Sequence, residues 1–178
     1  MKKVLITGGA GFIAHHIIAH IIKNTDWDIV TLDRLDLSGN LNRLHEILDE
    51  FSTADKKRLK IVFHDLKAEI NSQIKSELGK PDIILHLAAA SHVDRSIVAP
   101  DEFIRTNCDG TNVLCDIARE AEIARFIHIS TDEVYGSIDE GSFRETDPLS
   151  PRSPYSASKA GSDLIALSHH VTHDLPVI

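Results

Sequence analysis

A glycine-rich turn between an apolar run and a helical pattern constrains the fold of this chain most. The run KKVLIT (2–7) predicts a buried strand, and GFIAHHIIAHIIKN (11–24) has its apolar residues at helical spacing. The turn between them, TGGAGFIA (Thr7–Ala14), contains the pattern G-x-x-G-x-x-A. Glycines there let the backbone turn tightly and approach a pyrophosphate, and the helix N-terminus adds free N–H groups.

The alternation of strand and helix continues along the whole chain. The sequence predicts further strands at 28–33, 59–65, 81–89 and 125–130, helices at 41–51, 67–78, 100–120 and 155–170, and the start of a sixth strand at 175–178. The strands are continuously apolar, as expected when helices cover both faces of a parallel sheet. We therefore predict an α/β fold, a Rossmann-like doubly wound parallel sheet in one domain over residues 1–178.

Composition excludes several classes of function. The 178 residues carry a formal net charge of −8, which argues against a nucleic-acid or anionic-membrane surface. No apolar run approaches the length of a membrane span, and the N-terminal VLI is too short for a secretion signal. We expect a cytoplasmic protein. Cys108 and Cys115 should lie about 10 Å apart along one helix, too far for a disulfide.

An acidic residue at the end of the second predicted strand defines the expected cofactor. Asp33 lies 19 residues after Ala14. At that place an acid accepts hydrogen bonds from the ribose 2′-hydroxyl of NAD and repels the 2′-phosphate of NADP. The sequence therefore predicts NAD binding; a cap at the end of the strand is the alternative for Asp33 alone.

Two further features point to a reactive site. Tyr155 and Lys159 are spaced i, i+4, which places both on one helix face. A neighbouring ammonium favours the phenolate of a tyrosine, which can then remove a proton from a hydroxyl group. In STDEVYG (130–136), Asp132 and Glu133 follow a predicted buried strand, either as catalytic carboxylates or as solvated loop charges.

These motifs resemble the extended short-chain dehydrogenase/reductase family. Within it the chain is most similar to the nucleotide-sugar 4,6-dehydratases, above all those of dTDP-glucose. The resemblance is carried by TGGAGFIA, LDRLDLSGNL, LHLAAASHVDRSI, FIRTNCDGTNVL, ISTDEVYG and SPYSASKAGSD, which span nearly the whole chain. The pair STDEVYG and SHVDRSI separates these dehydratases from the sister 4-epimerases and decarboxylases, which usually lack the Asp-Glu pair.

The resemblance implies a role for each matching residue. The expected cofactor-binding residues are Gly8, Gly11, Phe12, Ile13, Asp33, Asp65, Leu66, Leu87, Ala88, Ala89, Thr106, Tyr155 and Lys159. Ser91 and Thr131 would contact a nucleotide-sugar substrate. The expected catalytic residues are Thr131, Asp132, Glu133, Tyr155 and Lys159.

The same resemblance implies a reaction in which NAD is regenerated. Tyr155 would take the proton of the sugar C4 hydroxyl while hydride leaves for NAD, with Lys159 lowering the tyrosine pKa. Glu133 would then remove the C5 proton, and Asp132 would protonate the departing C6 hydroxyl. Hydride would return to C6. A homodimer through the helices at 100–120 and 155–170 is also implied.

The chain departs from the family in places. Ala14 stands at the third glycine of the turn, where close helix packing tolerates alanine. Ala90 stands where these dehydratases commonly have Glu. Family members are about twice as long, so a C-terminal substrate-binding lobe is expected to be absent. A 4-epimerase and a non-catalytic NAD-binding module therefore remain alternatives. His169 and His173 fit a surface helix end, and no metal site is expected.

Overall fold

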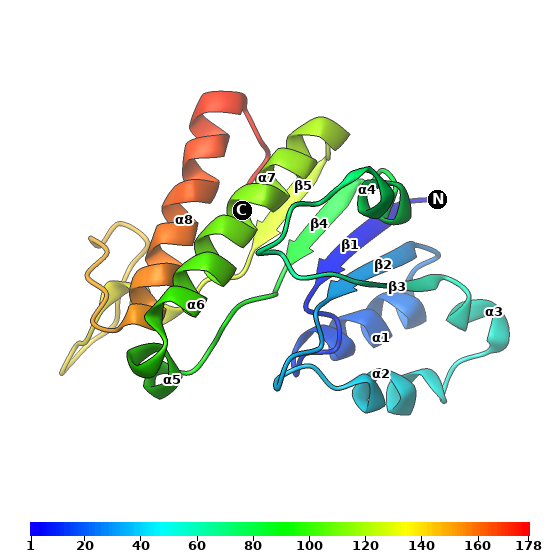
Figure 1. The fold of residues 1–178 in the computed structure, drawn as a ribbon, viewed down its shortest axis with the longest axis horizontal. Helices are drawn as coiled ribbons and strands as arrows, with labels where there is room; N and C mark the ends of the chain where they lie inside the picture. Colours follow the sequence, from blue (N-terminus) through cyan, green and yellow to red (C-terminus); the bar gives the residue numbers. More distant parts are fainter.

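The computed structural model describes residues 1–178 and shows one parallel sheet with helices on both faces (Figure 1). The strands are β1 (Lys3–Thr7), β2 (Asp28–Asp33), β3 (Leu59–Phe63), β4 (Ile83–His86) and β5 (Arg125–His128). Their order is β3-β2-β1-β4-β5, and every pair is parallel. The α/β class and the doubly wound sheet predicted from the sequence are confirmed.

The helices connect the strands and largely follow the prediction. They are α1 (Ala14–Asn24), α2 (Leu41–Leu48), α3 (Thr53–Lys56), α4 (Ser72–Leu78), α5 (Val93–Val98), α6 (Pro100–Ile104), α7 (Gly110–Ala121) and α8 (Pro154–His173). The short helices α3 and α5 were not predicted, because one or two turns show no clear apolar period. The helix predicted from residue 67 begins only at Ser72, where the Asn71 side chain caps the Ile74 N–H group.

The long helix predicted at 100–120 is confirmed as continuous helical backbone, but it is not an α-helix throughout. After α6 the backbone widens into a π-helical segment, Arg105–Asp109, and α7 follows it. Asn107 lies in this segment, and its side chain bonds the Ala90 N–H group (2.8 Å), the Ala90 carbonyl (3.1 Å) and Ser158 (2.8 Å). The apolar period did not reveal this widening, since residues on both sides of it stay on the buried face.

Two apolar cores lie on opposite faces of the sheet. On β1, Leu5 belongs to the core under α4, α7 and α8, whereas Val4 and Ile6 belong to the core under α1 and α2. Alternate strand residues point to opposite faces, so a strand buried on both sides must be apolar throughout. Figure 1 shows α7 and α8 side by side, away from α1 and α2.

Residues at the chain end lie beside β5. Val177 pairs with Phe126 in a parallel bridge, and His128 N–H donates to the Ile178 carbonyl at 2.8 Å. The sixth strand expected at 175–178 is therefore present as a short extension of the sheet. Cys115 is buried and Cys108 half-buried, and both are free thiols. None of the helices combines the length and the hydropathy needed to cross a bilayer.

The strand order determines where a ligand can bind. The chain leaves β1 toward β2 on one side, and β4 lies on the other side of β1. Helices from these two directions cover opposite faces, so a crevice opens at the carboxyl ends of β1 and β4. Ligands of doubly wound sheets bind in this crevice.

Candidate active site

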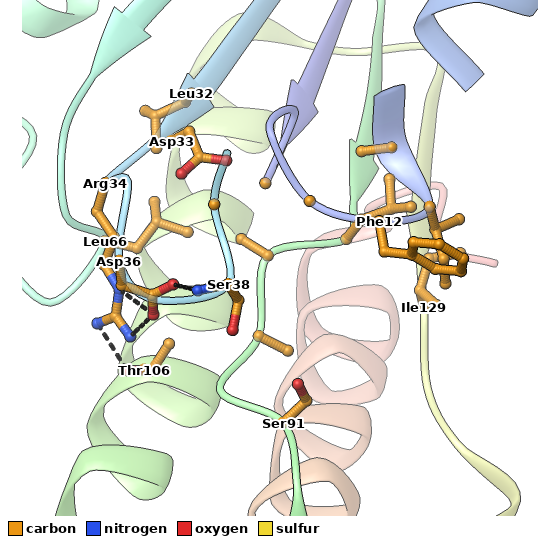
Figure 2. Close-up of a pocket in the computed structure, with 18 of the residues that line it drawn as sticks. Phe12, Leu32, Asp33, Arg34, Asp36, Ser38, Leu66, Ser91, Thr106 and Ile129 are labelled. Carbon is orange, nitrogen blue, oxygen red and sulfur yellow. Dashed lines mark hydrogen bonds and ion pairs between the residues drawn. The ribbon is translucent and has the colours of Figure 1, made fainter. Parts of the chain in front are cut away.

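A cavity of about 620 Å³ opens at the carboxyl edge of the sheet. Figure 2 shows part of its wall, with Asp33 and Arg34 on one side and Phe12 and Ile129 on the other. Every residue predicted to bind the cofactor lines this cavity: Gly8, Gly11, Phe12, Ile13, Asp33, Asp65, Leu66, Leu87, Ala88, Ala89, Thr106, Tyr155 and Lys159. Ser91, predicted to contact substrate, lines it too.

The glycine turn at the start of the cavity leaves no room for a side chain at Gly8 or Gly9. Gly8 has a φ of +74°, and a Cβ there would meet the Ala88 backbone at 3.0 Å. A Cβ on Gly9 would lie 1.8 Å from the Thr31 hydroxyl. The first position therefore needs glycine for its backbone conformation, and the second for close packing on β2. The turn thus brings the backbone of β1 directly to the cavity.

Asp33 is buried at the end of β2, with only 8% of its surface exposed. One carboxylate oxygen accepts the Ala10 N–H of the glycine turn (2.9 Å), and the other accepts the Leu35 N–H (2.7 Å). Each oxygen keeps a lone pair for a further donor, such as a ribose hydroxyl. Asp33 can therefore cap the end of the strand and bind a cofactor ribose at the same time.

Arg34, which the sequence did not single out, is held at the same end of the cavity. Its guanidinium bonds Asp36 at 2.7 Å (Figure 2). It also bonds Glu102 (2.8 Å) and lies 3.4 Å from Asp65. Lys67 also bonds Glu102, at 2.7 Å. Hydrogen bonds and charges of the acidic partners raise the pKa of Arg34 despite its partial burial. The arginine is therefore engaged by carboxylates rather than presented to a ligand phosphate.

Several other wall residues were missed. They lie near the end of β2 and in the loop after it, in α2 and after β3, β4 and β5: Leu32, Arg34, Asp36, Leu37, Ser38, Gly39, Arg43, His64, His92, Ile129 and Ser130. Arg43 ties the loop to the glycine turn, because it donates to the Ser38 carbonyl (2.7 Å) and the Ala10 carbonyl (3.2 Å). The polar run Ser38-Gly39-Asn40, between the predicted strand at 28–33 and the predicted helix at 41–51, was the signal in the sequence, but the position of this turn at the cavity depends on the contacts of Arg43.

Tyr155 and Lys159 lie in the first turns of α8. Ser153 caps this helix in a capping box with Ser156, which fixes the turn that carries Tyr155. Lys159 is only 4% exposed, and its Nζ donates to the Ile129 carbonyl at 2.6 Å. Burial lowers the pKa of Lys159, against the opposing effect of the Asp163 carboxylate. An ammonium group is thus held inside the cavity wall.

The pKa of Tyr155 is raised, in contrast to the lowering that the sequence suggested. Burial is the largest cause; the Thr131 hydroxyl acts in the opposite direction, and the charges of Glu133 and Asp132 raise the pKa further. Lys159 directs its Nζ at a backbone carbonyl. The carboxylates of Glu133 and Asp132 thus act on the pKa of Tyr155.

Thr131, Asp132 and Glu133 do not line the main cavity. Thr131 caps a single 3-10 turn, Asp132–Tyr135, by accepting the Glu133 N–H at 3.3 Å. Asp132 is exposed and lines a separate shallow pocket with Tyr135 and Phe143, whose rings stack at 5.3 Å. The loop after β5 therefore carries these side chains at the border of the cavity rather than inside it.

A buried polar chain backs the cavity. His86, at the end of β4, contacts Thr7 at 2.8 Å and Thr111 at 3.0 Å. The Thr111 hydroxyl donates to Asn107 O, and Thr7 Oγ1 accepts the Ala88 N–H. His86 must therefore donate from Nε2 and accept at Nδ1, which fixes one neutral tautomer. Burial lowers its pKa well below the usual range.

Two residues after β4 have unusual surroundings or backbone. Ala90, at the position where the family commonly has Glu, is buried, and its backbone is bound by Asn107. His92 has a φ of +83°, a strained value for a residue other than glycine. No three His, Cys, Asp or Glu side chains gather where they could hold a metal ion.

Comparison with known proteins identifies the family. The family model described as GDP-mannose 4,6 dehydratase matches residues 5–178. The chain belongs to this family. The glycan biosynthesis protein Agl12 of Haloferax volcanii is 45% identical over 98% of the chain, and a dTDP-glucose 4,6-dehydratase of Actinoplanes sp. is 45% identical over 99%. The chain spans 54% of the length of each.

Solved structures of the family agree with this assignment. DesIV of Streptomyces venezuelae, a dTDP-glucose 4,6-dehydratase solved with NAD bound, has a TM-score of 0.88 and 42% identity. The match covers 98% of this chain and 53% of DesIV. Several 4-epimerases of UDP-sugars share the fold at 25% to 30% identity. The resemblance to nucleotide-sugar 4,6-dehydratases drawn from the motifs is thus confirmed.

Proposed function

We propose that this chain binds NAD at the carboxyl edge of its sheet and carries the catalytic residues of a dTDP-glucose 4,6-dehydratase. The observation that carries the proposal is the composition of one cavity. Its wall holds the glycine turn and Asp33 at one end and Tyr155 with Lys159 at the other. Asp132 and Glu133 lie at its border, where their charges act on Tyr155.

The cofactor end would hold the two phosphates and the adenosine. The glycine turn exposes backbone N–H groups toward a pyrophosphate, and Asp33 would accept the ribose hydroxyls. Arg34 pairs with three carboxylates, so its guanidinium is not free for a 2′-phosphate. The Asp33 carboxylate would repel such a phosphate. The cavity therefore favours NAD over NADP.

The reactive end would divide proton transfer among three side chains. When bound, NAD accepts a hydride and later returns it. Tyr155 would take the C4 hydroxyl proton, with Lys159 stabilising the phenolate and Thr131 orienting it. Glu133 would remove the C5 proton, and Asp132 would protonate the leaving C6 hydroxyl. Glu133 is half-buried and Asp132 exposed, so the two carboxyls have different environments, as an acid and a base require.

The test is to incubate the purified chain with NAD and dTDP-glucose and to search by mass spectrometry for a product lighter by one water. Tyr155→Phe should abolish the product. Tyr135→Phe is the matched control, because it removes the chain's other phenol, which lies outside the cavity. Product formation that survives Tyr155→Phe would contradict the assignment.

A second candidate is a non-catalytic NAD-binding module. The observation that favours it is the position of Asp132 outside the cavity. NAD binding without any loss of water from dTDP-glucose would support this candidate. A 4-epimerase is less favoured, because the Asp132–Glu133 pair has no role in it.

We also propose that the chain forms a homodimer through α6 and α8, the helices that pack against each other. Exposed apolar side chains on them support this: Ile104, Leu164, Leu167 and Val171. Sedimentation should give a dimer that Leu167→Glu dissociates and that Phe63→Glu, on the edge strand β3 at the other side of the sheet, does not. A cytoplasmic location stays a prediction, supported by the two free thiols.

A further inference from the structure

Asp163, which no proposed catalytic step uses, bonds the end of β5 from α8. One of its carboxylate oxygens accepts the Ser130 hydroxyl at 2.5 Å. The other lies 3.0 Å from His128 Nε2. Ser130 and His128 flank Ile129, and alternate residues of an extended segment point to the same side. The carboxylate thus holds the backbone on both sides of one residue.

The residue between them is the one that Lys159 binds. Lys159 Nζ donates to the Ile129 carbonyl at 2.6 Å, and Asp163 lies one helical turn after Lys159. Lysine and aspartate therefore bind the same three-residue segment from neighbouring turns of α8. Any movement of this segment would change the position of the Ile129 carbonyl and of the loop that begins at Thr131.

The direction of the His128 hydrogen bond follows from its neighbours. The Ser162 hydroxyl donates to the Lys159 carbonyl at 2.7 Å, so it can only accept from His128 Nε2, at 3.2 Å. His128 Nε2 therefore carries a hydrogen and donates to Asp163 as well. Its Nδ1 is buried without a partner. The contacts with α8 are thus the only hydrogen bonds that orient this ring.

We propose that Asp163 is a positioning residue of the reactive site, whose carboxylate fixes β5 on both sides of Ile129 and so sets the place of Lys159 and of the Thr131–Glu133 loop. The inference rests on the proposed function for its catalytic meaning, but its structural content does not need bound NAD. The Asp163 charge also raises the pKa of Lys159, against the effect of burial.

Two substitutions separate geometry from charge. Asp163→Asn keeps the shape and can still bond both partners, because its amide oxygen accepts from His128 and the Ser130 hydroxyl can rotate to accept. It removes only the charge. Asp163→Ala removes both. Asp116→Asn is the control, since Asp116 pairs with Arg119 on α7 and touches nothing in the site.

The first measurement is amide hydrogen exchange of the chain alone, read by NMR. The Ile129 amide bonds the His86 carbonyl, and the Val134 amide bonds the Thr131 carbonyl. Asp163→Ala should accelerate exchange at both by about tenfold, as expected for local opening. Asp163→Asn and Asp116→Asn should leave it unchanged. Ser130→Ala, which keeps the charge, should accelerate exchange to a smaller extent and remains informative if Asp163→Ala does not fold.

The second measurement is the titration of Lys159, followed by NMR of ¹³Cε-labelled lysine and assigned with Lys159→Arg. Asp163→Asn should move the midpoint to lower pH by about one unit, because an opposite charge is lost. Asp116→Asn should not move it. Two results would overturn the proposal. One is an amide exchange rate in Asp163→Ala and Ser130→Ala equal to that of the wild type. The other is a shift of the Lys159 titration midpoint that is the same in Asp163→Asn and Asp116→Asn. If the wild type does not bind NAD, the proposed function is contradicted, but the exchange and titration measurements still test the role of Asp163.

Discussion

The two ends of the cavity are built differently. The end at Asp33 is built mainly from residues 7–43, with Asp65 and Glu102 reaching Arg34 from later segments, and its polar groups are paired with one another. The end at Tyr155 is assembled from segments far apart in sequence, and its carboxylates, Asp132 and Glu133, remain at the border. The polar groups at the Asp33 end thus satisfy one another, whereas at the Tyr155 end Glu133 is half-buried and Asp132 is exposed.

The largest expected effect is at the cofactor end. Gly9→Ala would place a Cβ 1.8 Å from the Thr31 hydroxyl, so the turn must shift off β2. We expect a loss of about 3 kcal/mol in the free energy of unfolding, as for other overpacked sites. Urea denaturation measures it. Thr31→Ala should recover part of the loss in the double variant; strict additivity of the two changes would contradict the contact.

The next effect tests the binding side chain of that end. Asp33→Ala should weaken NAD binding by about tenfold or more, because charged hydrogen bonds to the ribose are lost. Calorimetric titration gives the affinity, and a thermal melt records any cost of freeing the Ala10 N–H group. Asp26→Ala, an exposed acid just before β2, is the control. If Asp33→Ala and the wild type bind NAD with equal affinity, Asp33 does not bind the cofactor and the two ends do not differ in this respect.

The folded chain should lose stability in acid because of His86, which lies behind the cavity between its two ends. Its pKa is depressed in the folded chain, so the unfolded chain binds the extra proton below about pH 6.5. Stability is then complete above that pH and falls as the pH decreases, by up to about 1.4 kcal/mol per unit. Denaturation between pH 5 and 7 should show a smaller slope for His86→Gln, which can also bond both threonines. An unchanged slope would contradict the neutral histidine.

The smallest expected effect is a change in the pKa of Tyr155 at the reactive end. Glu133→Gln removes a charge that raises the pKa of Tyr155, so that pKa should fall by about half a unit. NMR of ¹³Cζ-labelled tyrosine can follow it, because the chain has only two tyrosines and Tyr135→Phe assigns them. Glu140→Gln, on an exposed loop, should have no effect. A rise in the Tyr155 pKa would contradict the assigned proximity.

The sequence predicted what depends on short-range patterns. All five strands were found within a few residues, because burial on both faces requires apolar runs such as the one at 28–33. The sixth strand's start was found too. The π-helical segment was not found, because it depends on contacts such as that of Asn107 with Ala90, 17 residues away. The short helices α3 and α5 were not found, because one or two turns show no clear apolar period.

The site followed the same division. Asp33 and the glycine turn could be predicted, because their spacing alone determines their meeting at the sheet edge. Arg34 and Arg43 could not, since their roles come from partners such as Glu102, which is 68 residues away in sequence. Asp163 was overlooked because an acid on a helix usually faces solvent, and only the fold places it against Ser130.

The π-helical segment Arg105–Asp109 has a consequence for insertions and deletions. A widened turn of this kind accommodates one more residue than an ordinary helical turn without rotating the helix beyond it. Loss of one residue there would return the segment to regular helix and leave α7 in register, though Asn107 would no longer reach Ala90. The same loss inside α7 would rotate the rest of that helix by about 100° and turn buried Leu114 or Ala118 toward water. One helix therefore contains both a tolerant and an intolerant position for a change in length.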